Sequence, residues 1–345
     1  MKQSVTAGVD IGGTNTVVGL IDDTGVCVLK SSFPTTGQGS AEQFVLLLAT
    51  IIHQLCRELP HESTLRGIGI AAPAANSRKG IIQNPANLQW KTIEIVEMVK
   101  RHFDLPIAVT NDANAAALGE MRGGCTKGMK NSIVITLGTG FGAGIVTDGH
   151  LLYGENGVAG ELGHVIVEPN GRVCGCGRRG CAETYVSATG ICRTVFELLA
   201  YDTTESALRD ISFNQLTSHK IYELAMQGDP IAREAFHITG KHLGLLLSNI
   251  AAAFDPEAIV LSGGMMNAGE LLLDPARESF DENRLDLKWR KVVIMKSQFG
   301  DGEAAVLGAS CLITEVAAQK PGVPALHDIY TQGSNDETSE GEEAV

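Results

Sequence analysis

The chain has too little positive charge for a protein that binds nucleic acid through its backbone. Its 345 residues include 27 Lys and Arg against 40 Asp and Glu, which gives a formal net charge of −13 at pH 7. Such a charge repels nucleic acid phosphates, so we expect no nucleic acid partner. A small anionic nucleotide is not excluded, because loops and helix N-termini bind phosphate locally.

Long apolar runs are also missing. The most apolar stretch, residues 243–254, is interrupted by Ser248 and Asn249, so we expect no membrane-spanning helix. The first residues lack the charged start, apolar centre and cleavage site of a secretion signal. A cytoplasmic protein is therefore predicted. The length suits about two domains, and the apolar content of 44% is enough for a sizeable core.

Eight cysteines without a secretion signal do not suggest a disulfide framework. Three of them share a glycine-rich segment, residues 161–183, with one histidine: His164, Cys174, Cys176 and Cys181. A disulfide or simply buried thiols are the alternatives. The C-x-C-x4-C spacing with an upstream His instead favours a Cys3His site, one of the ligand sets of structural Zn2+. Glu161 and Glu183 bracket this predicted zinc loop.

Apolar β-type runs alternate with helical patterns along the chain. The runs 5–12, 16–22 and 27–33, separated by glycine-containing turns, predict an antiparallel meander. Further strands are predicted at 65–72, 105–110, 132–138, 143–150, 258–262 and 291–296. Helices are predicted from Ser40 to about 59 and at 93–103, 112–121, 184–199, 230–254 and 303–316. An α/β protein follows.

The strand pair at 132–150 echoes the opening hairpin, since each has an apolar strand, a glycine-rich turn and a second strand ending in acid and glycine. This hints at two related halves. We predict an N-terminal α/β domain at 1–115, completed by the C-terminal helix 303–318, and a larger C-terminal domain at 116–302. The polar, acidic tail 321–345 is predicted to be disordered.

Two glycine-rich turns, each after an apolar strand, are candidate phosphate loops. Gly12 and Gly13, followed by Thr14, let backbone N–H groups approach a phosphate, and Leu137–Gly142 is a second loop of this kind. Ordinary hairpin turns are the alternative. Asp10, before the first turn, is a candidate ligand for Mg2+. No G-K-[ST] follows either loop, so neither is a Walker A motif.

Asn111 and Asp112 stand where a predicted strand meets a helix. An acidic residue there is explained by helix capping alone. The pair also offers an amide that orients a hydroxyl and a carboxylate that accepts its proton, which is what phosphoryl transfer requires. The third glycine pair, Gly263 and Gly264, also follows a strand and lets a flat adenine lie close to the backbone.

Taken together, D-I-G-G-T, N-D-A-N, L-G-T-G-x-G-A-G, G-E-L-G-H and C-G-C-G-x-x-G-C-x-E resemble the ROK family over about residues 5 to 318. The resemblance implies the actin-like ATPase/hexokinase fold, which is ribonuclease H-like, with two domains around a central cleft. It also implies ATP-dependent phosphorylation of a hexose or amino sugar, Mg2+ with the ATP, and a homodimer.

The resemblance also assigns roles to residues. Asp112 matches the catalytic base. The matching substrate contacts are Asn76, Asn87, Asn111, Asp112, Glu161, His164 and Glu183. The matching ATP contacts are Asp10, Gly12, Gly13, Thr14, Thr139, Gly140, Gly263 and Gly264. His164 is expected to serve twice, with one ring nitrogen on zinc and the other donating to the sugar.

One segment departs from the family pattern, because residues 71–76 read A-A-P-A-A-N where many members read G-x-P-G. The added methyl groups change the predicted sugar pocket. Glucose is the expected acceptor, with N-acetylglucosamine, N-acetylmannosamine or fructose as alternatives. A sugar-responsive regulator is the other branch of the family. Its DNA-binding module would precede the first strand, which here begins within the first few residues.

Overall fold

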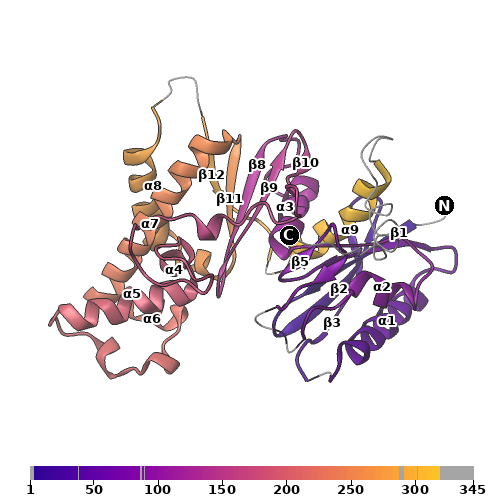
Figure 1. Cartoon of the computed structure of the whole chain (residues 1–345), viewed down its shortest axis with the longest axis horizontal. Coiled ribbons are helices and arrows are strands. Elements are labelled where there is room, and N and C mark those ends of the chain that lie inside the picture. The colour runs from indigo at the N-terminus through magenta and orange to yellow at the C-terminus, as the bar shows by residue number, and fades with distance from the viewer. Residues whose placement is uncertain are drawn as a thin grey trace, which may run out of the picture. The chain divides into compact units, whose positions relative to one another are not determined.

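A computed structural model describes residues 4–37, 39–85, 88, 90–286, 291–300 and 302–318 (Figure 1). The predictions for Asn87 and for the tail 321–345 fall outside these residues. The chain forms two compact units. The first comprises the described residues of Met1–Gly124, Tyr153–Ala159 and Gly302–Val345, and the second those of Cys125–Leu152 and Gly160–Asp301.

A five-stranded mixed sheet forms the centre of the first unit, in the order β3-β2-β1-β4-β7. Its strands are β1 (Ser4–Ile11), β2 (Asn15–Asp22), β3 (Cys27–Pro34), β4 (Thr64–Ala71) and β7 (Ile107–Thr110). The first three form the predicted antiparallel meander, and β4 and β7 continue the sheet in parallel to β1. The three parallel strands therefore end at one edge of the sheet.

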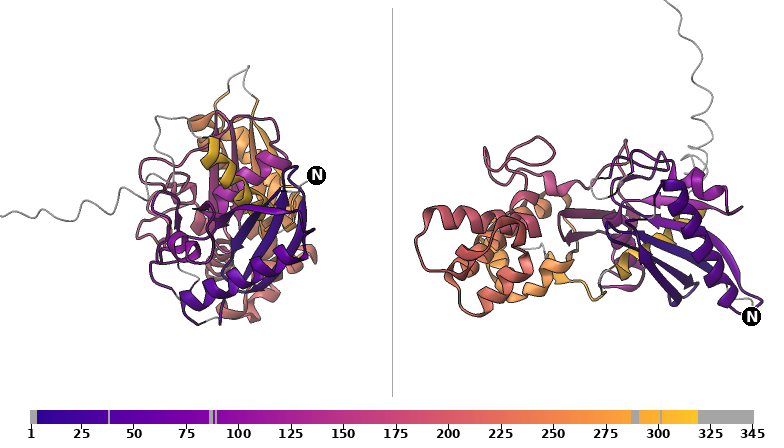
Figure 2. Two further views of the ribbon diagram at one scale, coloured as in Figure 1. Left: turned by 90° about the vertical axis from the view of Figure 1, so that its right-hand side faces the viewer. Right: turned by 90° about the horizontal axis from the view of Figure 1, so that it is seen from below.

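Helices cover both faces of this sheet. α1 (Ala41–Glu58) and α2 (Ile95–Lys100) share an apolar core with one face (Figure 2). Ser40 caps α1 as predicted, in a capping box with Gln43, whereas α2 is shorter than predicted. α3 (Asp112–Gly123) and α9 (Glu303–Ala318) pack together, and α9 lies on the other face.

The close approach of α9 to the sheet depends on two glycines. A Cβ on Gly8 would lie 2.0 Å from the carbonyl oxygen of Val306, and one on Gly69 would lie 1.7 Å from that of Ala309. No side chain fits at either position. The helix that lies last along the described chain is thus part of the first unit.

The second unit repeats the topology of the first. Its strands are β8 (Ser132–Leu137), β9 (Phe141–Thr147), β10 (His150–Leu151), β11 (Ala258–Ser262) and β12 (Val293–Lys296). Their order is β10-β9-β8-β11-β12, with three antiparallel strands followed by two that run parallel to β8. The weak echo between the two halves of the sequence is therefore confirmed as a repeated strand order.

The helices of the second unit share one apolar core with its sheet. They are α4 (Glu183–Val186), α5 (Ala188–Tyr201), α6 (Ser218–Met226), α7 (Pro230–Phe254) and α8 (Glu270–Asn283). The helix predicted at 184–199 is two helices, because Ser187 is extended and its hydroxyl caps α5 by accepting the N–H of Gly190. No helix in the described part of the chain is long and apolar enough to cross a membrane.

Short elements complete the two units. They are β5 (Ala75–Asn76) and β6 (Ile81–Ile82), which pair as a separate two-stranded sheet, and the 3-10 turns η1 (Leu162–His164), η2 (Ala207–Asp210), η3 (Phe213–Gln215) and η4 (Gly264–Ala268). The mixed α/β architecture agrees with the fold class that the sequence predicts.

Candidate active site

In the first unit, polar residues gather where the parallel strands end. Asp10 lies near the end of β1, and Asn111 and Asp112 follow β7 directly. Asp112 is near enough to Asp10 for its charge to raise the pKa of Asp10. The carboxyl ends of parallel strands are the usual place for ligand sites in α/β proteins.

Asn111, rather than Asp112, is the N-cap of α3. Its Oδ1 atom accepts the N–H of Ala113 at 2.8 Å, and the Oδ1 atom of Asp112 accepts the same N–H at 2.8 Å. Capping therefore explains Asn111 fully and Asp112 only in part. The cap occupies Oδ1 of Asn111, so its Nδ2 group is the donor that suits a substrate hydroxyl.

Burial raises the pKa of Asp112 even though the carboxylate accepts the Ala113 N–H, which acts in the opposite direction. The start of a helix also favours a negative charge. Desolvation is the larger effect here. A carboxylate held in this way has a greater affinity for a proton than an exposed one, which is what a general base needs.

The raised pKa of Asp10 affects the stability of the folded protein. Burial, and then the charge of Asp112, raises its pKa from 3.8 to about 7. Because the folded pKa lies above the unfolded one, the favourable contribution of this group is complete below pH 3.8. It is lost as the pH rises to about 7, where the folded protein must bury a charge.

In the absence of Mg2+, we expect Asp10→Asn to stabilise the first unit of the protein by up to about 4 kcal/mol at pH 8, since one pKa unit corresponds to about 1.4 kcal/mol. The gain should be smaller at pH 5, where Asp10 is already protonated in the folded state. Urea unfolding at both pH values in Mg2+-free buffer measures it. Asp104→Asn, at an exposed position, is the matched control, and equal behaviour of the two variants would contradict the prediction.

The predicted phosphate loop of the first unit is the tight turn between β1 and β2. The N–H of Gly12 donates to the carbonyl of Asn15 at 3.0 Å, and a Cβ on Gly12 would lie 2.8 Å from that oxygen. Thr14 is exposed at the tip, and Gly13 is partly exposed. The segment is therefore a hairpin turn, as the alternative interpretation predicts. The turn still exposes backbone groups and the Thr14 hydroxyl to a ligand.

Asn76 is occupied by protein groups. Its Nδ2 group donates to the carbonyl of Asn156 at 2.9 Å, and its Oδ1 atom accepts the N–H groups of Arg78 and Lys79, each at 3.1 Å. The side chain is only 6% exposed. Asn76 therefore holds the segment Tyr153–Ala159, and its predicted sugar contact would have to use the remaining amide hydrogen.

In the second unit, the turn Gly138–Gly140 joins β8 to β9. A carboxylate oxygen of Glu183 accepts the N–H of Phe141 at 3.1 Å, and the Ala188 N–H donates to the Gly138 carbonyl at 2.9 Å. The Thr189 hydroxyl donates to the Thr139 carbonyl at 3.1 Å. The second predicted phosphate loop is thus held by residues 183–189, while Thr139 itself is exposed.

Gly263 and Gly264 directly follow β11. The end of β11 lies beside the end of β8 in the same sheet. Gly263 has a φ of +91°, and a Cβ on it would lie 2.5 Å from the carbonyl oxygen of Leu137. A Cβ on Gly264 would meet no atom within 4 Å. Gly263 is therefore required by the backbone, and Gly264 leaves open space where a flat ligand can approach.

His164, Cys174, Cys176 and Cys181 form a candidate metal centre. Their four ligand atoms all lie within 4.8 Å of one another. The sulfur atoms of Cys176 and Cys181 are 3.7 Å apart, and Nδ1 of His164 is 3.6 Å from the sulfur of Cys174. A disulfide requires about 2.05 Å. Sulfur ligands about 2.3 Å from a tetrahedral ion are about 3.8 Å apart, so the cluster has the size of a metal site.

The carboxylates that bracket this cluster lie beside it. Oε2 of Glu161 is 3.8 Å from Nε2 of His164, and Oε1 of Glu183 is 3.9 Å from the sulfur of Cys174. The two ring nitrogens of His164 thus face different groups, with Nδ1 toward the thiols and Nε2 toward Glu161. This arrangement is compatible with the predicted double role of His164.

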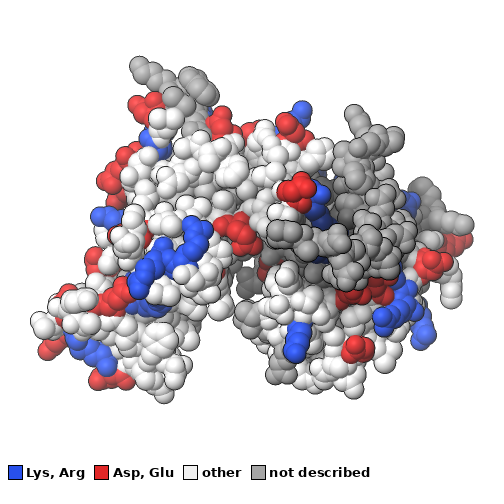
Figure 3. All heavy atoms as spheres, in the orientation of Figure 1, with Lys and Arg blue, Asp and Glu red and all other residues white. Residues whose placement is uncertain are grey.

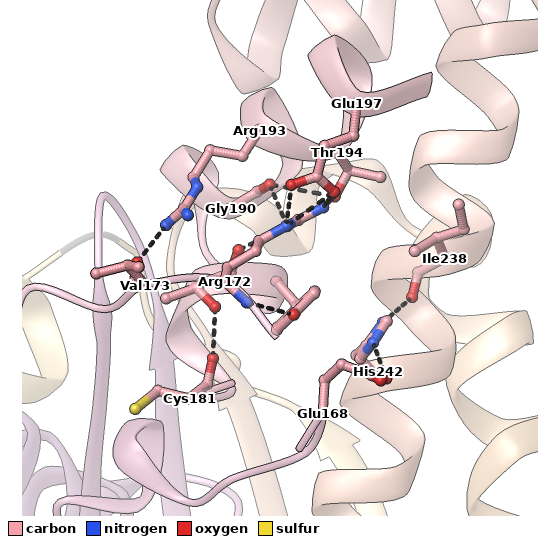
Figure 4. A network of polar contacts seen from close by, with 12 residues as sticks. Glu168, Arg172, Val173, Cys181, Gly190, Arg193, Thr194, Glu197, Ile238 and His242 are labelled. Carbon is pink, nitrogen blue, oxygen red and sulfur yellow. Dashed lines mark hydrogen bonds and ion pairs between the residues drawn. The ribbon is translucent and has the colours of Figure 1, made fainter. Parts of the chain in front are cut away.

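Sequence reasoning missed Arg172, the side chain that orders this region. It is 9% exposed and bonds Thr184, Gly190, Thr194 and Glu197 (Figure 4). A single arginine in a glycine-rich loop is expected to be exposed to solvent, so nothing in the local sequence pattern predicted its burial. Thr189 was missed as well, although it lies in the first turn after Ser187, and serine is a favoured helix N-cap.

Comparison with known proteins gives a consistent family. Residues 6–316 match the sequence model of the ROK family. The chain is 35% identical over 312 residues to a glucokinase of Halalkalibacterium halodurans, a match covering 89% of this chain and 94% of that protein. It is 27% identical over 315 residues to a xylose repressor of Bacillus spizizenii, covering 91% of this chain and 78% of the repressor.

Comparison with solved structures gives the same family. The fold matches the crystal structure of a ROK family glucokinase from Streptomyces griseus in complex with glucose and AMPPNP, with a TM-score of 0.74 and 34% sequence identity. That match covers 90% of this chain and 99% of the other. The fold also matches a ROK hexokinase from Thermus thermophilus with a TM-score of 0.77 and 28% identity, over 91% and 100% of the two chains.

Proposed function

The chain belongs to the ROK family, and from this premise we propose that it is an ATP-dependent sugar kinase that converts glucose to glucose 6-phosphate. The observation that carries the proposal is the partly buried Asp112 carboxylate at the start of α3, close to Asp10, in a chain 35% identical to a glucokinase. Similarity to a glucokinase that holds glucose and AMPPNP supports both substrates.

The reaction follows from the chemistry of these groups. The sugar hydroxyl oxygen attacks the γ-phosphorus of ATP, the bond from that phosphorus to the β–γ bridging oxygen breaks, and ADP leaves. Asp112 accepts the hydroxyl proton as the attack proceeds, and the Asn111 amide orients the hydroxyl. Mg2+ carried with ATP supplies charge neutralisation when bound, and Asp10 offers a carboxylate of the kind that this ion prefers.

The remaining predicted residues divide between the two substrates. We propose that Glu161, His164 and Glu183 bind sugar hydroxyls, as Asn111 and Asp112 do. Gly12, Gly13, Thr14, Thr139 and Gly140 then contact phosphates, and Gly263 and Gly264 the adenosine. Asn76 and Asn87 are kept as sugar contacts, and Asn76 has one amide hydrogen for this role. The homodimer that the resemblance implies and the cytoplasmic location that the sequence predicts remain predictions.

We propose that the Cys3His cluster holds a structural Zn2+. Three thiol sulfurs and one imidazole nitrogen at these separations suit zinc, and four protein ligands leave no position for substrate. The ion orients the His164 ring, because metal ligation at one nitrogen fixes where the other N–H points. The metal thereby organises the sugar side of the site without taking part in the chemistry.

An ADP-release assay over a panel of sugars tests the proposed function. We expect turnover with glucose, and lower kcat/KM with N-acetylglucosamine, N-acetylmannosamine, mannose and fructose. The phosphorylated carbon of each product identifies the acceptor hydroxyl. Release of ADP without any phosphorylated sugar would contradict the proposal, and a preference for another sugar would correct only the acceptor.

A sugar-responsive regulator is the second candidate, because the chain is also 27% identical to a xylose repressor. The charge of −13 disfavours DNA binding. On the face shown in Figure 3, the described basic side chains lie in separate groups with acidic and uncharged atoms between them, and form no continuous basic surface. A gel-shift assay at physiological salt, with and without glucose, distinguishes the candidates, since a kinase alone gives no shift.

A further inference from the structure

Residues 183–190 support the turn Gly138–Gly140 of the second unit, which the proposed function places in the ATP site and which we call the nucleotide turn. They contact residues 138–141 through the Glu183 carboxylate, the Ala188 N–H and the Thr189 hydroxyl. This segment consists of the one-turn helix α4, the extended residue Ser187 and the start of α5. A helix of four residues satisfies few of its own backbone groups, so other contacts must fix the segment.

Arg172 supplies those contacts at both ends of the segment. Its Nη1 group donates to the carbonyl oxygen of Thr184 at 2.6 Å and to that of Gly190 at 3.1 Å. Its Nη2 group donates to the hydroxyl of Thr194 at 2.9 Å (Figure 4). The guanidinium therefore joins α4 to the first turns of α5.

The guanidinium is fully engaged by the protein. Nε and Nη2 bind the Glu197 carboxylate at 2.8 and 2.6 Å, so all five N–H donors of Arg172 have partners. Its charge lies 4.3 Å from the centre of the Tyr185 ring, which stacks on His242. Burial and then the charge of Arg172 lower the pKa of His242, which keeps its ring neutral beside the cation. Arg172 is thus a structural cation rather than a site for an anionic ligand.

Arg172 also belongs to the loop of the candidate metal centre. Its backbone N–H donates to the Tyr185 hydroxyl at 3.0 Å, and its carbonyl accepts the N–H of Gly180, next to the ligand Cys181, at 2.8 Å. One residue therefore connects the metal loop to the segment that supports the nucleotide turn.

We propose that Arg172 is a positioning residue for nucleotide binding: it fixes residues 183–190 at both ends and, through them, the turn at Thr139. This inference rests on the proposed function, because it takes Gly138–Gly140 as part of the ATP site. A lysine cannot replace Arg172, since one ammonium group cannot reach Thr184, Gly190 and Glu197 from a single point.

The test compares three variants by ADP titration calorimetry and by the KM for ATP. We expect Arg172→Lys to weaken nucleotide binding about tenfold, and Thr189→Val about threefold, because each removes bonds that position the turn. Glu197→Gln is the matched control. It weakens the ion pair and lowers the melting temperature but leaves both Nη1 bonds, so its Kd for ADP should stay within about twofold of wild type.

The outcomes separate the two proposals. An equal loss of affinity in Glu197→Gln and Arg172→Lys would show a merely structural role, and an unchanged Kd in Arg172→Lys would also overturn the inference. If Arg172→Lys does not fold, an unchanged Kd in the exposed Thr189→Val variant overturns it. Wild-type protein that binds ADP but phosphorylates no sugar would overturn the proposed function alone, whereas wild-type protein that binds no nucleotide overturns both.

Discussion

Asp112→Asn should lower the turnover number by about 10²- to 10⁴-fold, the usual contribution of a general base. The substitution removes the proton acceptor. It leaves an Oδ1 atom that can still accept the Ala113 N–H, which Asp112 accepts at 2.8 Å. We therefore expect the fold and the affinity for glucose to be retained. Steady-state kinetics with calorimetric glucose titration measures both quantities.

The pH dependence of kcat/KM in the wild type provides a second test of Asp112. Because burial raises the pKa of Asp112, kcat/KM should fall on acidification, and the fall should begin at a higher pH than the usual range of an exposed carboxylate. Asp104→Asn, at an exposed position, should change neither the turnover nor the profile. Turnover of Asp112→Asn within tenfold of wild type would remove Asp112 from the reaction.

Removing the proposed zinc should have the largest effect on stability. Structural zinc contributes about 10–16 kcal/mol to the folding of small zinc peptides at pH 7. Residues 161–182 have no helix beyond the short turn η1 (Leu162–His164), so the proposed ion would supply much of their order. We expect zinc-free protein to melt on the order of 10 °C lower, since 1 kcal/mol shifts a domain of this size by about 2–4 °C.

Cys176→Ser reproduces this loss genetically, and Cys27→Ser is its matched control, because both thiols are exposed and only Cys176 belongs to the cluster. Elemental analysis should find about one zinc per chain in wild type and in Cys27→Ser. Thermal melting with and without a chelator gives the stability difference. A Cys176→Ser variant that keeps both its zinc and its melting temperature would refute the assignment.

Most of the fold was predictable, because its signals are local. Alternating apolar residues and glycine turns located the β1–β2–β3 meander, and the Ser40 cap located α1. The cysteine spacing predicted the grouping of the three thiols, because the loop between Cys174 and Cys181 is too short to separate them widely. The break between α4 and α5 was missed, although Ser187 is a residue type that favours the N-cap position.

The parts that escaped prediction depend on distant neighbours. Arg172 is ordered by Glu197, Thr194 and the Tyr185 ring, and no spacing rule relates these positions. The high pKa of Asp10 arises from burial and from Asp112, a residue that follows another strand of the sheet. Likewise, the contact of Asn76 with the carbonyl of Asn156, 80 positions away in the sequence, becomes visible only when the chain is folded.

The position of α9 bears on how the protein is made. Gly8 and Gly69 receive a helix that a ribosome delivers only after the second unit has been translated. Until then the nascent first sheet lacks one of its covers, and its apolar strands stay open to association with other chains. Maturation of the first unit therefore waits until α9 has been synthesised, and chains that stall before Glu303 should be strong clients for chaperones or proteases.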